Sequence, residues 1–219
     1  MDGEAYPITP ARKAVTDMGI FPEDYNPSSS LVEQSYAAAL FFHYTRNIGK
    51  PLNAINSWVT AKDGKNSPKD DLADIAKAND YLPFSGIWHG FAFAFATKMI
   101  KYPSGDIINH VTLTSSALAT ESLTKDATRK APRTVKAFTF NIIRFTLPAN
   151  TQYKFGVPVA STTFLCSVRR KGETEWGLLA FDAGIYSSQV ASGTTYMETL
   201  CSCASANDCS GSLTVKRTT

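Results

Sequence analysis

Apolar residues in the first half of the chain recur mainly at helical spacing. Within residues 31–47, Val32, Tyr36 and Leu40 are four positions apart, which places them on one face of a helix. A Ser-x-x-Glu capping box that begins at Ser30 marks the start of this helix. Further helices are predicted over residues 11–18, 68–79 and 106–123.

Residues 84–100 carry two hydrophobic patterns at once. Phe91, Phe93 and Phe95 alternate with alanine, which is the spacing of a strand, whereas Phe91, Phe95 and Met99 are four apart, which is the spacing of a helix. Alanine, lysine and methionine favour helix, and so does the length of the segment. We therefore expect a helix that is buried nearly all round.

The second half of the chain is typical of β-structure. Runs rich in valine, isoleucine, phenylalanine and threonine are separated by turn residues. Two of these runs flank a glycine-containing loop at Lys171–Glu173 and predict a hairpin. The predicted strands cover residues 134–147, 153–159, 162–170, 174–181, 192–203 and 212–217.

These elements predict an α+β protein in which a helical N-terminal half packs against a C-terminal antiparallel β-sheet. Residues 1–29 hold four prolines and several apolar anchors, so they are expected to form an extended N-terminal arm. This arm either folds back on its own domain or lies on a neighbouring subunit. Residues 30–126 form the predicted helical region, and residues 127–219 form a basic, β-rich region that joins it in one compact unit.

Composition is that of a folded protein, with 219 residues, 43% hydrophobic and 19% charged. The formal net charge of +3 is unevenly distributed. Residues 1–126 carry 11 basic against 14 acidic side chains, residues 127–172 carry 9 against 0, and residues 173–219 carry 2 against 5, giving −3, +9 and −3. The middle block is therefore basic between two acidic flanks.

An acid-free basic block with interleaved aromatic residues is typical of a surface that binds a polyanion. Lysine and arginine neutralise phosphates, and aromatic rings stack on unpaired bases. The alternative is that the aromatic residues form the core face of the β layer and that the charges are solvated. The predicted nucleic-acid-binding residues are Arg129, Lys130, Arg133, Lys136, Arg169, Arg170 and Lys171.

No pattern of nucleophile, base or metal ligand points to catalysis. Glycine-rich phosphate loops and Gly-x-Ser-x-Gly are absent, and the three histidines lie in apolar or helical contexts. Cys201, Cys203 and Cys209 lack the spacing of a zinc site, and Cys166 lies within a strand-like run. We therefore expect no enzymatic activity, no cofactor and no metal.

The start of the sequence, Met1-Asp2-Gly3-Glu4, is acidic and no apolar core follows it, so no secretory signal is expected. An intracellular chain would keep its four cysteines as reduced thiols. Residues 84–100 are interrupted by polar residues, glycine and proline, so no stable membrane span is expected.

Together these features predict a self-assembling viral coat or nucleocapsid protein, located in the cytoplasm or the virion. Its partners would be further copies of itself, through the arm and the sheet edges, and single-stranded nucleic acid, most simply RNA. Two alternatives stay open. One is a small cytosolic enzyme with a cysteine-based site, and the other is a membrane-active protein that inserts residues 84–100.

Overall fold

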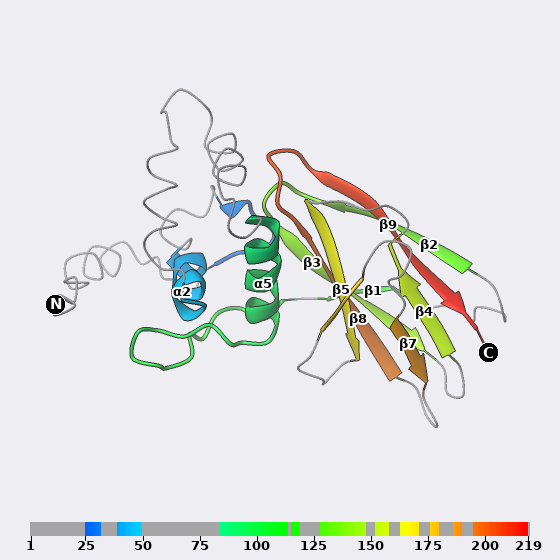
Figure 1. Ribbon diagram of the computed structural model, residues 1–219, viewed down its shortest axis with the longest axis horizontal. Helices are drawn as coiled ribbons and strands as arrows, with labels where there is room; N and C mark the ends of the chain where they lie inside the picture. The colour runs from blue at the N-terminus through cyan, green and yellow to red at the C-terminus, as the bar shows by residue number, and fades with distance from the viewer. Residues whose placement is uncertain are drawn as a thin grey trace.

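The computed structural model describes residues 25–31, 39–49, 84–113, 115–118, 128–147, 152–157, 163–170, 176–179, 186–189 and 195–218. Within them the fold is α+β with strands dominant (Figure 1). The elements in chain order are α2 (Ala39–Asn47), α5 (Phe84–Ala96), β1 (Ser115–Leu118), β2 (Thr128–Val135), β3 (Phe140–Leu147), β4 (Gln152–Gly156), β5 (Phe164–Arg170), β6 (Gly177–Leu178), β7 (Tyr186–Gln189), β8 (Thr195–Cys203) and β9 (Cys209–Arg217).

The strands form two sheets. The first has the order β1-β3-β8-β5-β6, and the second has the order β2-β9-β4-β7. Neighbouring strands are antiparallel, except that β1 runs parallel to β3. The consecutive strands β8 and β9 lie in different sheets, so the short loop between them crosses from one sheet to the other.

One face of the first sheet packs against the second sheet. Residues buried between them come from β3, β5 and β8 on one side and from β2, β4 and β9 on the other. Phe145 of β3, for example, contacts Phe155 of β4 with ring centroids 5.7 Å apart. Alternation along β4 and β9 sends every second side chain into this core.

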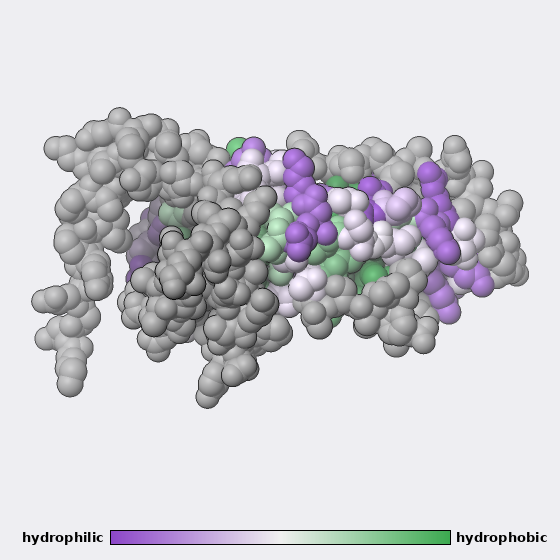
Figure 2. All heavy atoms as spheres, turned by 90° about the horizontal axis from the view of Figure 1, so that it is seen from above, coloured by the Kyte–Doolittle hydropathy of each residue, from purple (hydrophilic) through white to green (hydrophobic). Residues whose placement is uncertain are grey.

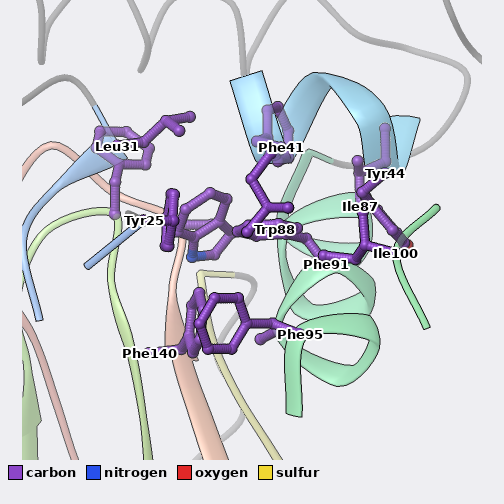
Figure 3. Packing of buried hydrophobic residues seen from close by; sticks show 14 of the residues in the cluster. Tyr25, Leu31, Phe41, Tyr44, Ile87, Trp88, Phe91, Phe95, Ile100 and Phe140 are labelled. Atoms are coloured by element: carbon purple, nitrogen blue, oxygen red, sulfur yellow. The ribbon is translucent and has the colours of Figure 1, made fainter. Parts of the chain in front are cut away.

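The other face of the first sheet is covered by α5, and α2 lies outside α5 (Figure 1). Aromatic side chains fill this layer, with Trp88 and Phe91 of α5 between Phe41 of α2 and Phe140 of β3 (Figure 3). Their ring centroids lie 5.2–5.9 Å apart, at the distance where edge-to-face pairs are favourable. The prediction of a helix in this segment is confirmed for Phe84–Ala96.

The end of the predicted arm belongs to this aromatic core. Tyr25 is fully buried, and its ring contacts those of Phe91, Phe95 and Phe140. The Leu31 amide donates to the carbonyl oxygen of Phe138 at 3.3 Å. Residues 25–31 therefore fold back on their own chain, and the rest of the predicted arm lies outside the described residues.

Two predicted elements differ from the structure. The run 134–147 is divided, because β2 ends at Val135 and a turn precedes β3, with Phe138 at φ 49°. The predicted helix over 106–123 is wrong where it is described: Lys101 and Ile107 form an antiparallel bridge, and Ser115–Leu118 is strand β1. The coarse α+β class is confirmed, but a helical N-terminal half is not, since only α2 and α5 are helices among the described residues.

Candidate binding groove

The histidines in the described residues have structural partners. His89 of α5 is 3% exposed and lies between two serines of the first sheet. Its Nδ1 is 2.7 Å from Ser202 Oγ, and its Nε2 is 2.9 Å from Ser167 Oγ. Burial lowers the pKa of His89 to about 4, so the ring is neutral at pH 7. This arrangement ties the helix to β5 and β8 but leaves no accessible nucleophile.

His110 is also buried. Its ring stacks on Phe95 with centroids 4.1 Å apart, and burial lowers its pKa, with a smaller contribution from the charge of Lys98. The Lys98 ammonium donates to the carbonyl oxygen of His110. His43 packs edge-on against Tyr102.

The cysteines form two disulfide bonds, Cys166–Cys201 and Cys203–Cys209. The register of β5 and β8 places Cys166 directly opposite Cys201, and the second bond closes the loop between the two sheets. The prediction of reduced thiols is therefore wrong, because strand register brings together cysteines that are distant in sequence. Bonded sulfurs also cannot serve as the nucleophile of a cysteine-based enzyme.

The predicted nucleic-acid-binding residues lie on two different sheets. Arg129, Lys130 and Arg133 belong to the edge strand β2, which Lys136 directly follows, whereas Arg169 and Arg170 end β5. Along β2 the burial pattern turns Arg129 and Arg133 to the less exposed side and Lys130 outward. Burial lowers the pKa of the Arg133 guanidinium. Lys171 lies outside the described residues.

One acidic residue forms ion pairs with two arginines of the basic block, residues 127–172. The Glu198 carboxylate is 3.0 Å from Arg169 Nη2 and 3.2 Å from Arg144 Nη2. These residues are direct neighbours across β3, β8 and β5. Because Glu198 is 6% exposed, its charge is concentrated on the two arginines rather than on solvent.

Beside this ion cluster a groove of about 590 Å³ opens between α2 and α5. Such a volume is in the range of small-molecule sites. Gly90 of α5 allows α2 to pack close to α5, since a methyl group at this position would overlap the Tyr44 hydroxyl. Burial raises the pKa of Tyr44 to about 12, so this hydroxyl stays protonated. The lining residues are Tyr44, Asn47, Ile48, Gly90, Phe93, Ala94, Thr97, Met99, Lys101 and Trp176.

One wall of the groove is an aromatic side chain held on both sides. The Trp176 ring stacks on Phe93 with centroids 5.6 Å apart, and the Arg169 guanidinium lies 4.4 Å from the Trp176 ring. Arg169 is in turn fixed by Glu198 through its Nε and Nη2 atoms. The indole N–H of Trp176 is buried and has no hydrogen-bond partner among the described residues.

The rim of the groove is cationic. Lys101 lines it and is exposed. The side chain of Asn47 is engaged by the backbone of Lys101, which fixes the rim between α2 and the turn after α5. No acidic side chain belongs to the described lining. The arrangement suits a ligand that is apolar at one end and negative at the other.

Sequence reasoning did not find this groove. Its residues come from α2, α5, the turn after α5 and the β6 region, and the first and last of them, Tyr44 and Trp176, are about 130 residues apart in the chain. The one local signal was Gly90 within a strongly apolar helix, because a glycine inside a helix often marks a close approach.

The fold and groove define a disulfide-linked two-sheet α+β protein with a helical layer. No family model matches the chain, and no curated protein matches its sequence. Similar solved structures include PliG, a periplasmic inhibitor of g-type lysozyme, from Salmonella Typhimurium, Escherichia coli (a mutant) and Aeromonas hydrophila. Their identities are 11%, 10% and 13%, and their TM-scores are 0.36, 0.35 and 0.34. They cover 48%, 48% and 47% of this chain and 99%, 99% and 96% of their own.

The prediction of a self-assembling viral coat or nucleocapsid protein that binds single-stranded RNA is wrong. Within the structure, Glu198 neutralises part of the basic block, and Tyr25 of the predicted assembly arm packs into its own core. The prediction of an intracellular location is wrong as well, because the cysteines form two disulfide bonds, and such bonds persist in oxidising compartments.

These neighbours are named as inhibitors of g-type lysozyme. At TM-scores of 0.34–0.36, lysozyme binding itself is not carried over to this chain. Among the described residues, no three His, Cys, Asp or Glu side chains are grouped to hold a metal ion. In the same part of the chain, no helix has the length and hydropathy needed to cross a membrane.

Proposed function

We propose that this protein is a non-catalytic binding protein of an oxidising compartment, and that the groove between α2 and α5 binds an amphipathic anion. The observation that carries the proposal is the combination of an apolar groove of about 590 Å³ with the cation of Lys101 at its rim. An alkyl chain or aromatic ring would lie against Phe93 and Met99, and its negative group would meet Lys101.

The groove is prepared for binding before the ligand arrives. Trp176 is held between Phe93 and Arg169, and Arg169 is held by Glu198, so little side-chain freedom is lost on binding. The two disulfides restrain the sheet that carries β5 and β8.

Titration with the fluorescent anion 11-(dansylamino)undecanoate tests the proposal. We expect saturable binding that dodecanoate competes for and dodecyltrimethylammonium does not, because Lys101 favours a negative head group. Met99→Asp should weaken binding by about tenfold or more, since it removes apolar contact and adds a negative charge.

Ile107→Asp is the matched control. Ile107 is 58% exposed and Met99 is 60% exposed, but Ile107 does not line the groove. Binding should be unchanged in this control. An equal loss in both variants, or no saturable binding by the wild type, would rule out the groove as the site.

A further inference from the structure

The end of α5 holds an apolar side chain at the surface. Figure 2, seen from above, shows purple hydrophilic and pale neutral residues over much of the part of the molecule that holds the strands. Met99, in contrast, is 60% exposed and lines the groove together with Ala94 and Thr97. These three residues belong to the last turn of α5 and to the chain that directly follows it. The position of this groove wall therefore depends on how the helix ends.

α5 ends in a Schellman motif that has lysine where glycine is usual. The Met99 amide donates to the Ala94 carbonyl oxygen at 2.9 Å, and the Lys98 amide donates to that of Phe95 at 3.2 Å. The motif needs a left-handed residue at position 98, and Lys98 has φ 56°. A side chain is unfavourable in this conformation, because its Cβ approaches the following carbonyl oxygen. Such a backbone persists only when the surrounding structure supports it.

The support comes from the side chain of Lys98 itself. Its ammonium donates to the backbone carbonyl oxygen of His110. The segment that holds His110 is anchored in turn, since the Ile108 amide donates to the Ile100 carbonyl oxygen and both isoleucines are fully buried. We call the contact between Lys98 and His110 the latch, because it joins the helix end that forms the groove wall to a buried part of the chain.

The His110 ring suits its site only while it is neutral. Its Nδ1 is 2.9 Å from the Val111 carbonyl oxygen and therefore carries the proton, since a carbonyl oxygen only accepts. Its Nε2 is then an acceptor, and it is buried without a hydrogen-bond partner among the described residues. Protonation would place a donor and a positive charge at Nε2, in a ring that stacks on Phe95 and lies near the ammonium of Lys98.

The ring and the ammonium are coupled through their charges. Burial lowers the pKa of His110 most, the charge of Lys98 lowers it further, and the hydrogen bond to Val111 acts in the opposite direction. Among the described residues, Lys98 is the charged group that acts on this ring. A neutral ring therefore allows the ammonium to stay at the His110 carbonyl, whereas a charged ring repels it.

We propose that the latch makes the groove sensitive to acid: protonation of His110 breaks the contact with Lys98, loosens the wall at Met99 and releases the bound anion. The release of a ligand rests on the proposed function, whereas the movement of the wall does not. Because histidine has a pKa of about 6.5 outside its buried site, affinity should be constant above about pH 7 and should fall as the pH drops below about 6.5.

Amide hydrogen exchange without ligand tests the latch itself. The protection factors of the Lys98 and Met99 amides, which correct for the intrinsic effect of pH on exchange, should fall by about tenfold between pH 7.5 and 5. Both amides donate to carbonyl oxygens of the motif, so they report on its opening. This range lies above the pKa of His89, which is about 4, so that ring stays largely neutral. Unchanged protection of both amides would overturn the inference.

Calorimetry with decanesulfonate over the same pH range tests the control of the ligand. This probe is apolar at one end, and its sulfonate stays charged throughout, so a change in affinity reflects the protein. The wild-type affinity should fall by about tenfold from pH 7.5 to 5. His110→Phe keeps a ring against Phe95, and Lys98→Gly keeps the left-handed turn, but neither variant has the latch. Both should bind at pH 7.5 and lose most of the dependence on pH.

His89→Gln is the matched control, because it removes a buried histidine of α5 whose ring nitrogens bond to serines of β5 and β8. It should keep the wild-type response, and circular dichroism at pH 5 should show that all variants are folded. A wild-type affinity that does not change with pH, or a response that survives in both latch variants, would overturn the inference. If the amides lose protection in acid but the wild type does not bind decanesulfonate at pH 7.5, the proposed function fails and the latch stands.

Discussion

The two faces of β8 show how differently one strand can be stabilised on its two sides. Leu200 and Ser202 point toward α5, into a layer dominated by aromatic rings and closed by His89. Cys201 and Cys203 point toward the second sheet and are covalently linked to Cys166 and Cys209. The helical side depends on packing and on hydrogen bonds such as those of His89 and Trp88, whereas the inter-sheet side has covalent links in addition to its apolar contacts.

This difference has thermodynamic consequences. Packed rings stabilise the native state directly through burial and edge-to-face contacts. A disulfide acts mainly by restricting the unfolded chain, and more strongly when it closes a longer loop. The two sides of β8 should therefore respond differently to reducing agents, to acid and to single substitutions.

The largest expected effect comes from removing the disulfide within the first sheet. Cys166 and Cys201 are 35 residues apart, and Cys203 and Cys209 are 6 apart. Loop-closure entropy then predicts that Cys166→Ala/Cys201→Ala lowers the free energy of unfolding by about 4 kcal/mol, and Cys203→Ala/Cys209→Ala by about 2 kcal/mol. Urea unfolding of both double variants measures the difference.

A dithiothreitol control links this effect to the covalent bonds. Reduced wild-type protein should unfold near the urea midpoint of a variant that lacks all four cysteines. If reduction left the wild-type midpoint unchanged, the disulfides would contribute nothing to stability.

The second largest effect is expected from acid, which should lower the stability of the side of β8 that packs against α5. The pKa of His89 is about 4 in the folded protein and about 6.5 in the unfolded chain, so the unfolded state binds more protons between these values. Stability is therefore complete above about pH 6.5 and is lost as the pH falls toward 4, by up to about 3 kcal/mol. Burial of His110 lowers its pKa too and adds loss of the same sign.

Thermal unfolding at several pH values from 7.5 to 4 would measure how the stability falls with pH. His89→Gln should flatten this dependence on pH, since glutamine does not titrate. A slope unchanged by His89→Gln would show that this histidine does not couple the helix to acid.

The smallest effect separates ring packing from hydrogen bonding in the aromatic layer. The Tyr25 hydroxyl is buried without a hydrogen-bond partner among the described residues, and burial raises its pKa. Tyr25→Phe should therefore be neutral or stabilising by up to about 1 kcal/mol, whereas the comparison variant Tyr25→Ala, which also removes the buried ring, should be destabilising. Chemical unfolding of the two variants gives both values, and a costly Tyr25→Phe would reveal a partner for the hydroxyl.

Local patterns predicted the parts of the fold that depend on local spacing. Residues spaced by four identified the buried stripe of α5, and a glycine-containing loop identified the pairing of β5 with β6. The end of α5 could not be predicted from the sequence. The helix ends at Ala96, and Lys98 adopts a left-handed conformation with φ 56°, which at a helix end is usually adopted by glycine. Phe138 has the same kind of conformation between β2 and β3, which is why that run was predicted as one strand.

The candidate sites depend on contacts that local patterns do not contain. Glu198 is 54 residues from Arg144 and 29 from Arg169. The net charge of residues 127–172 therefore did not include the carboxylate that pairs with these two arginines. Trp176 meets Phe93 only because β6 lies beside β5 in the sheet that α5 covers. The compartment was mispredicted for the same reason, since only strand register pairs the cysteines.

The central strands of the two sheets are consecutive in the chain and late in it. β8 separates β3 from β5 in the first sheet, and β9 separates β2 from β4 in the second. During synthesis, four strands leave the ribosome before the strand that each must pair with exists. The sheets are therefore completed together, by one stretch of chain from Thr195 to Arg217, after the strands that this stretch pairs with have been made. Until then the unpaired strand edges are open to pairing with other chains, so we expect the incomplete protein to be more prone to aggregation than the folded one.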